Sequence, residues 1–152
     1  MRIRPARIGD GPAAIKLYKE LVGDDVAVAD GPLGAKRWAA VVTHAGTSVF
    51  VAEDPAEGVI GVLTLHVLPN VSFGGQSYGL VENVVVTGAH RRKGLGRALM
   101  EAAIKEAWKS DCHQIMLLTG RDLDAEGFYA RMGFEDAPKA GMILKRPRDL
   151  RI

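Results

Sequence analysis

The sequence predicts an α/β protein in which helices cover both faces of a central mixed sheet. Three observations predict this fold: stretches with strand-like and helix-like spacing of apolar residues alternate, glycine-rich turns separate them, and one long amphipathic stretch joins two apolar runs. A length of 152 residues is enough for one domain with a sizeable core. We therefore expect a single domain over residues 1–152, with the element order β-α-α-β-β-β-α-β-α-β.

The first half of the chain is expected to form a strand, two helices and three further strands. Residues 2–8 alternate weakly between polar and apolar side chains, as in a strand. Asp10 and Pro12 are typical of a helix start, and Gly23 is typical of a helix end. A second helix is expected over residues 35–43. Three strands joined by short turns, which suits antiparallel pairing, are expected over residues 48–53, 59–68 and 78–86.

The second half is expected to contain a helical crossover between two parallel strands. Residues 94–109 carry one apolar stripe at helical spacing, as a helix packed on a sheet requires. The short apolar run 114–118 should then lie parallel to strand 78–86, because a helix joins them. A short helix over residues 125–132, stopped by Gly133, and a final strand over residues 141–145 complete the prediction.

Composition excludes several classes of protein. No apolar run approaches the roughly 20 residues that span a bilayer, and residues 1–7 lack an apolar signal core, so we expect no membrane partner and a cytoplasmic location. The single cysteine, Cys112, excludes an internal disulfide framework. The four histidines show no metal-ligand spacing, so no metal is expected. A net charge of +2 is too small to indicate a nucleic-acid partner.

The stretch 81–100 reads as a buried strand, a short turn, a basic glycine loop and the start of a helix. Its cations are Arg91, Arg92, Lys93 and Arg97. A helix N-terminus offers free N–H groups and a partial positive charge, and glycines let the backbone approach an anion. A cluster of cations alone is also typical of solvated surface, but the glycines within it favour a phosphate site.

Two common phosphate motifs fit this loop poorly. A dinucleotide fingerprint would use Gly94 and Gly96, but Leu99 stands where close packing needs glycine or alanine, and the loop begins several residues after the strand. A nucleoside-triphosphate loop needs Gly-Lys-Ser/Thr, whereas the sequence has Gly-Leu-Gly-Arg. The remaining interpretation is a loop that wraps a pyrophosphate with successive N–H groups.

Two motifs support that interpretation. Arg-Arg-Lys-Gly-Leu-Gly at residues 91–96 fits Arg/Gln-x-x-Gly-x-Gly/Ala, and residues 125–134 fit Ala-x-x-Phe-Tyr-x-x-x-Gly-Phe. In this order, with a Val-Val-Val strand before the first, the motifs make the chain resemble the GCN5-related N-acetyltransferase (GNAT) superfamily over about residues 80–134. Residues 81–86 and 112–118 also look like the corresponding strands of glucosamine-6-phosphate N-acetyltransferases.

The resemblance implies acetyl-coenzyme A as cosubstrate. Loop N–H groups would hold its pyrophosphate, and the strand before the loop would pair with its pantetheine arm. The residues implied are Val84, Val85, Val86, Arg91, Arg92, Lys93, Gly94, Leu95, Gly96, Arg97, Ala98 and Phe128. Two positions depart from the family pattern: Arg92 stands where glycine is frequent, and Asp122 stands where an asparagine is common and cannot donate a hydrogen bond to the coenzyme.

Tyr129 and Glu82 are the predicted catalytic residues. A phenol is protonated at neutral pH, so Tyr129 suits a general acid, although without the family context it reads as a packing aromatic. Glu82 interrupts an apolar strand, where an unpaired carboxylate is costly, so it is a base, an ion-pair partner or an edge-facing side chain. Asn83 lies on the opposite face if the strand is regular, and could bind substrate or satisfy backbone groups.

The acceptor residues are less defined. Asp25 could attract a cationic amine or serve only as a turn residue, and Arg121 could bind an acidic or phosphorylated acceptor or be solvated. Cys112 precedes a buried strand and suits a small buried hydrophobe, which argues against a covalent acetyl-cysteine route.

The sequence thus predicts a transferase that moves the acetyl group of acetyl-coenzyme A to a small-molecule primary amine, by direct attack in a ternary complex. The alternatives are a protein N-terminal or lysine acetyltransferase, a silent acyl-coenzyme A-binding module, and a nucleic-acid binder that uses the basic cluster. A homodimer through the edge of the C-terminal strand is a further expectation.

Overall fold

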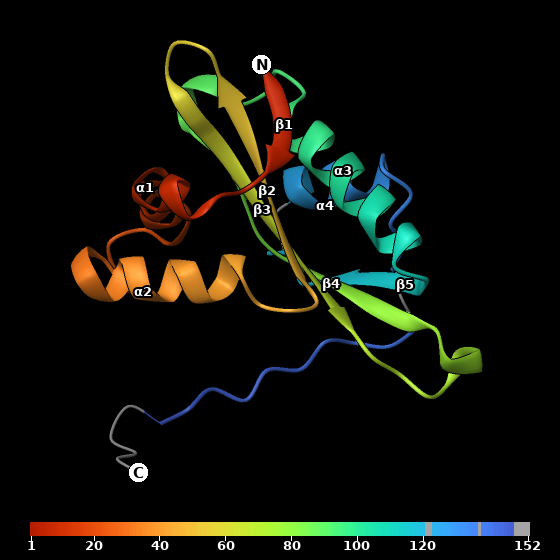
Figure 1. Ribbon diagram of the computed structural model, residues 1–152. Helices are drawn as coiled ribbons and strands as arrows, with labels where there is room; N and C mark the ends of the chain where they lie inside the picture. The colour runs from red at the N-terminus through yellow and green to blue at the C-terminus, as the bar shows by residue number, and fades with distance from the viewer. Residues whose placement is uncertain (121–122, 137, 148–152) are drawn as a thin grey trace. The chain divides into compact units, whose positions relative to one another are not determined.

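A computed structural model describes residues 1–120, 123–136 and 138–147. The chain divides into two compact units, Met1–Leu117 and Leu118–Ile152. The first unit contains a five-stranded sheet with α1, α2 and α3, and the second contains α4 (Figure 1). No helix in the described residues is long and apolar enough to cross a membrane.

The sheet of the first unit has the strand order β1-β2-β3-β4-β5. The first four strands, β1 (Arg2–Pro5), β2 (Thr47–Asp54), β3 (Gly58–Leu68) and β4 (Ser77–Val86), are antiparallel to their neighbours. The last strand, β5 (Cys112–Leu117), is parallel to β4. The predicted mixed sheet is therefore confirmed, including the parallel pair that the helical crossover implied.

Helices cover both faces of this sheet, as predicted. One face packs against α1 (Gly11–Val22) and α2 (Gly31–Val42), and the other packs against α3 (Leu95–Lys109) (Figure 1). Gly61 of β3 allows the close approach of α3, because a Cβ there would lie 3.2 Å from the Leu99 side chain. The core on the opposite face consists of Ala14, Leu17, Trp38, Val49, Val51, Val62 and Val85.

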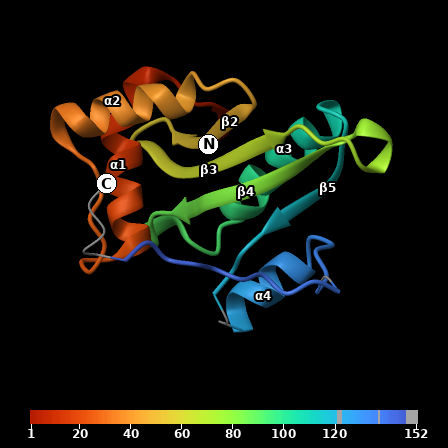
Figure 2. The same cartoon turned by 90° about the horizontal axis from the view of Figure 1, so that it is seen from below.

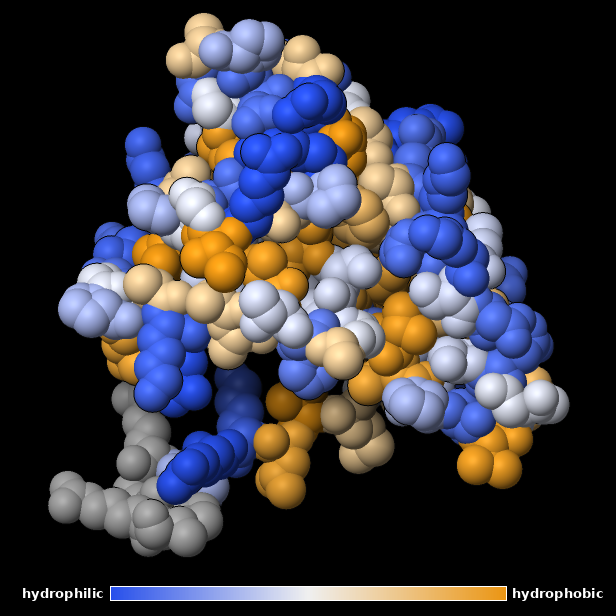
Figure 3. Space-filling view, viewed as in Figure 1, coloured by the Kyte–Doolittle hydropathy of each residue, from blue (hydrophilic) through white to orange (hydrophobic). Residues whose placement is uncertain are grey.

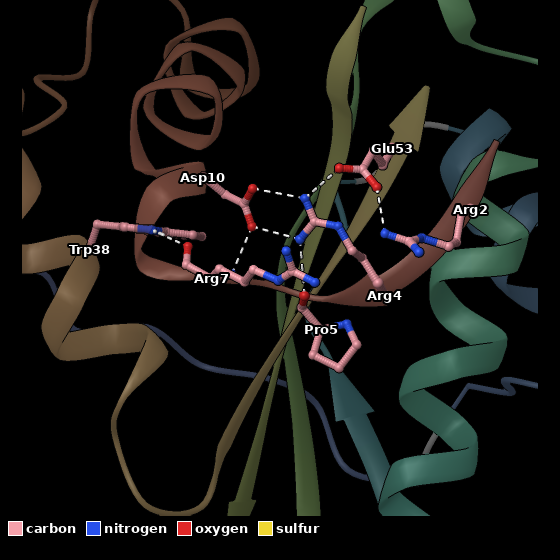
Figure 4. A network of polar contacts seen from close by, with 7 residues as sticks. All are labelled: Arg2, Arg4, Pro5, Arg7, Asp10, Trp38 and Glu53. Carbon is pink, nitrogen blue, oxygen red and sulfur yellow. Dashed lines mark hydrogen bonds and ion pairs between the residues drawn. The ribbon is translucent and has the colours of Figure 1, made fainter. Parts of the chain in front are cut away.

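A buried ion-pair network ties the start of α1 to the sheet (Figure 4). Arg4 donates to both Asp10 oxygens at 2.8 and 2.9 Å and to Glu53 at 2.8 Å, with its side chain only 10% exposed. Asp10 also accepts from the Arg7 backbone N–H, and Trp38 Nε1 donates to the Arg7 carbonyl. The network therefore connects β1 and β2 to both helices of that face.

The start of the second helix and the last predicted strand differ most from the sequence prediction. The second helix begins at Gly31 rather than Ala35, because proline at the first turn, here Pro32, fits a helix start. The predicted strand over residues 141–145 is wrong, since residues 141–147 form no regular element and Leu144 is 99% exposed. A strand needs a partner for its backbone groups, and no described strand pairs with this segment. The predicted homodimer would form through the edge of that strand. It stays a prediction, and this strand no longer supports it.

The connection between β3 and β4 is anchored by an aromatic stack. It contains the short helical turn η2 (Phe73–Gly75), where the Phe73 ring lies 4.0 Å from the His113 ring of β5, nearly parallel to it. Val71 in the same connection is 93% exposed. Single exposed apolar side chains are ordinary surface features. Figure 3 shows hydrophobic and hydrophilic residues interspersed on one face.

Candidate active site

The basic loop presents a row of backbone N–H groups at the start of α3. The N–H groups from Arg92 to Arg97 have no acceptor within the described residues. The groups on either side are occupied: Arg91 donates to the Gly88 carbonyl, and Ala98 donates to the Gly94 carbonyl. The free row thus lies inside the predicted Arg91–Ala98 segment, at the positive end of a helix of 15 residues.

The loop backbone has the geometry of an anion nest. Arg92 has φ 61° and Gly94 has φ 80°, both in the left-handed region. A left-handed residue next to a right-handed one, as Gly94 is to the first helical residue Leu95, turns successive N–H groups toward one side, which creates a concave surface for a negative ion. Glycine adopts this conformation freely, whereas Arg92 adopts it at a cost in backbone energy.

The four cations near the row have different surroundings. Arg91 donates to the Val86 carbonyl at 3.1 Å and to Glu20 at 3.2 Å, so its guanidinium is already engaged. Arg97 is paired with Glu101 at 2.8 Å. Arg92 and Lys93 are exposed and make no hydrogen bond or ion pair with the described residues, so they are the cations available to a bound anion.

The second half of β4 has an open edge. Pairing between β4 and β5 runs from Ser77 opposite Cys112 to Val81 opposite Leu117, while β4 continues to Val86. Figure 2 shows β5 diverging from β4. The backbone groups of residues 82–86 that face away from β3 therefore have no strand partner in the described chain, and an extended ligand that carries amides can pair with them. Val85 offers only its backbone here, because its side chain is in the core.

A β-bulge lies at the beginning of this open edge. On β3 the register advances from Val62 to Thr64, while on β4 it moves from Val85 back to Glu82, so β4 contains one extra residue. Asn83 sits within this bulge with φ 55°. The strand is therefore not regular at this point, so the condition for placing Asn83 on the opposite face is not met, and Asn83 is exposed at a bend of the strand. The asparagine itself was the available signal, because asparagine tolerates positive φ and is rare in strands.

Glu82 lies beside one polar side chain, Thr64, which in turn contacts Tyr18, and the sequence indicated neither. It pairs across the sheet with Thr64, is half-buried, and has no hydrogen bond or ion pair within the described residues. Thr64 Oγ1 is buried and makes no well-formed hydrogen bond with those residues. Burial raises the pKa of the Tyr18 hydroxyl on α1, and the Thr64 hydroxyl opposes this rise. Tyr18 and Thr64 were missed because nothing in their local sequence distinguishes them from core residues.

Tyr129 belongs to the second unit, on α4 (Leu123–Ala130). Its ring contacts Phe128 and Phe134, with centroid separations of 5.0 and 5.8 Å in edge-on geometry. Burial raises the pKa of the Tyr129 hydroxyl above the ordinary value for tyrosine. The hydroxyl is therefore protonated at neutral pH, as a general acid must be.

The structure brings none of the remaining predicted residues that it describes into the candidate site. Asp25 is exposed in the connection between α1 and α2, and Arg121 and Asp122 lie outside the described residues. Cys112 is buried, and burial followed by the neighbouring Asp111 charge raises the pKa of its thiol, which agrees with a packing role. No group of three potential metal ligands was found in the described part of the chain.

Comparison with known proteins agrees with this arrangement. The model of the acetyltransferase (GNAT) family matches residues 14–134. A solved structure from Agrobacterium tumefaciens, described as a candidate acetyltransferase, is 33% identical, with a TM-score of 0.87 over 96% of this chain and 100% of that one.

Two curated relatives have named substrates. The glucosamine 6-phosphate N-acetyltransferase of Trypanosoma brucei brucei is 30% identical over 88 residues, which is 58% of each chain, so the match spans little more than half of that relative. An L-methionine sulfoximine/L-methionine sulfone acetyltransferase of Pseudomonas aeruginosa is 27% identical over 97% of this chain and 90% of the relative. On the family match and the shared fold, the chain belongs to the acetyltransferase (GNAT) family.

Proposed function

We propose that the protein is an N-acetyltransferase that moves the acetyl group of acetyl-coenzyme A to a small-molecule primary amine, by direct attack in a ternary complex. The observation that carries this proposal is the row of unpaired N–H groups from Arg92 to Arg97, next to the open edge of β4. A pyrophosphate needs several donors close together, and an amide-bearing arm needs a free strand edge. The family membership supports the same ligand.

The residues present fit the coenzyme. The N–H groups from Arg92 to Arg97 would hold its pyrophosphate, and the side chains of Arg92 and Lys93 would meet the remaining charge. The peptide groups of Val84–Val86 would align its amide arm. When bound, acetyl-coenzyme A supplies an activated acetyl thioester.

Glu82 and Tyr129 would handle the protons. An alkyl ammonium group has a pKa near ~10, so at neutral pH a base must remove a proton before the amine can attack. Glu82 takes this proton on its free carboxylate, directly or through a water molecule. Tyr129 Oη donates its proton to the departing sulfur, a role that rests on the resemblance of residues 125–134 to the family motif.

A small-molecule acceptor is supported by the curated relatives, which are named for an aminosugar phosphate and for derivatives of an amino acid. The family model extends across the border between the two units, which supports treating residues 1–152 as one acetyltransferase domain. The cytoplasmic location and the lack of nucleic-acid and membrane partners remain predictions from composition.

The test is a panel of aminosugar phosphates, amino acids, polyamines and peptides, assayed for release of free coenzyme A thiol, with coenzyme binding measured by calorimetry. We expect coenzyme binding and thiol release with a small amine. Release with peptides alone would favour the protein acetyltransferase. Binding without release from any amine would indicate the silent module, and absence of binding would contradict the proposal.

A further inference from the structure

The turn between β4 and the basic loop is held by a carboxylate from a distant part of the chain. This turn, η3 (Gly88–His90), connects the end of β4 to Arg91. Glu20 of α1 lies 68 residues before Gly88, and its Oε1 accepts a hydrogen bond of 2.7 Å from the Gly88 N–H. The same oxygen accepts a bond of 3.2 Å from Arg91 Nη2. One side chain therefore fixes the residues at both ends of the turn.

The neighbouring contacts extend this anchoring. Arg91 Nε donates to the Val86 carbonyl at 3.1 Å, which connects the guanidinium to the last residue of β4. His90 is buried, with its Nε2 2.9 Å from Glu57 of the turn between β2 and β3. Residues 88–91 are thus held from two directions, whereas the N–H groups that follow them are free. The fixed segment ends where the candidate anion site begins.

We propose that Glu20 is a positioning residue for coenzyme binding: it fixes the turn from which the row Arg92–Arg97 starts, and it holds Arg91 as part of that anchor rather than as a phosphate ligand. The inference rests on the proposed function, because the row must bind the coenzyme. A row of N–H groups binds an anion well only if the groups converge before the anion arrives. Glu20 supplies that order in the free protein.

The negative charge of Glu20, taken alone, should weaken coenzyme binding rather than strengthen it. Coenzyme A carries several negative charges on its phosphates, and a carboxylate close to the loop repels them. If Glu20 acted only through its charge, a neutral side chain there would tighten coenzyme binding. If Glu20 positions the turn, the same substitution weakens binding. The sign of the change therefore separates the two roles.

The test compares Glu20→Met, Glu20→Gln and the wild type by calorimetric titration with coenzyme A, without an acceptor, alongside thermal unfolding. Methionine removes the acceptor of both hydrogen bonds, so we expect binding about tenfold weaker. Glutamine keeps an oxygen for the Gly88 N–H and loses only the ion pair, so we expect a loss of about twofold. Partial rescue by glutamine distinguishes positioning from a simple effect of charge.

The matched control is Glu101→Gln, which removes the same charge from an ion pair with Arg97 on α3 and leaves the turn untouched. We expect this variant to bind coenzyme A as tightly as the wild type, or more tightly. If Glu20→Met unfolds at the same temperature as the wild type, unchanged or tighter coenzyme A binding by this variant would overturn the proposal. If that variant is unstable, tighter binding by Glu20→Gln would overturn it. A wild type that does not bind coenzyme A would overturn the proposed function and this inference with it.

Discussion

The proposed coenzyme side and the proposed acceptor side of the candidate site are built from different chemical groups. The coenzyme side consists of backbone: the N–H row Arg92–Arg97 and the open edge of β4. The proposed acceptor side consists of side chains: Glu82 pairs across the sheet with Thr64, and Thr64 contacts Tyr18. Backbone groups are common to every sequence that adopts the loop, whereas side chains differ from one chain to the next. The proposed coenzyme side can therefore be shared by proteins whose acceptors differ.

Substitution of Glu82 should have the largest effect and should separate the two sides most clearly. Glu82→Gln keeps the shape of the side chain but cannot accept a proton, so we expect kcat to fall about a thousandfold. Coenzyme A affinity should stay within about twofold, because the N–H row is intact. Thiol release and calorimetric titration measure the two quantities. A kcat near that of the wild type would exclude Glu82 as the base.

Tyr129→Phe should give the next largest effect. It removes the hydroxyl and keeps the ring that contacts Phe128 and Phe134. We expect kcat to fall about a hundredfold while the unfolding temperature changes by no more than a few degrees. The matched control is Tyr78→Phe, which also deletes a phenol hydroxyl, but on β4 and outside the candidate site. Equal losses in the two variants would show that Tyr129 has no special role as the acid.

The Arg4 network should make the stability of the first unit depend on pH. Hydrogen bonds from Arg4 lower the pKa of Asp10, and those from Arg4 and Arg2 lower the pKa of Glu53 to about 2 from 4.5. Carboxylates with lowered pKa values stabilise the fold above the unfolded-state value, and this stability is lost as pH falls through the folded-state value. The unfolding temperature should therefore drop between about pH 4.5 and about pH 2.

Asp10→Asn tests this network at neutral pH. It removes the charged carboxylate that accepts two hydrogen bonds from the buried Arg4 guanidinium. We therefore expect the free energy of unfolding to fall by about 3 kcal/mol. The variant should also show a smaller drop in unfolding temperature on acidification. The exposed pair of Lys19 and Asp30 provides the control, since Asp30→Asn should leave the free energy of unfolding nearly unchanged. Equal costs for the two variants would contradict the importance of the network.

Gly94→Ala should have the smallest effect, confined to the coenzyme side. Gly94 has φ 80°, which an alanine adopts at a cost of about 1 kcal/mol. We expect coenzyme A binding to weaken about fivefold, because the alanine moves the N–H row away from its nest conformation. Gly9→Ala is the matched control, with open space for a Cβ and no positive φ. Unchanged binding by Gly94→Ala would show that the nest geometry is not required.

The same difference between backbone and side chains explains what the sequence could predict. The strand, loop and helix around residues 91–96 follow from local patterns, and α3 begins within one residue of its expected start. The bulge at Asn83 and the contact of Thr64 with Tyr18 depend on register and on elements far apart in the chain. The Glu20 contact with Gly88 spans 68 residues and has no local signature. The strand expected over residues 141–145 failed because its apolar residues resemble a strand but have no described partner.

The most direct test of the N–H row is amide hydrogen exchange, residue by residue, with and without coenzyme A. If the row binds the pyrophosphate, the amides from Arg92 to Arg97 gain protection on binding. The amides of Arg91 and Ala98 change little, because each already donates to a carbonyl. Protection that appears elsewhere in the chain while Arg92–Arg97 continue to exchange at their free rate would contradict the account.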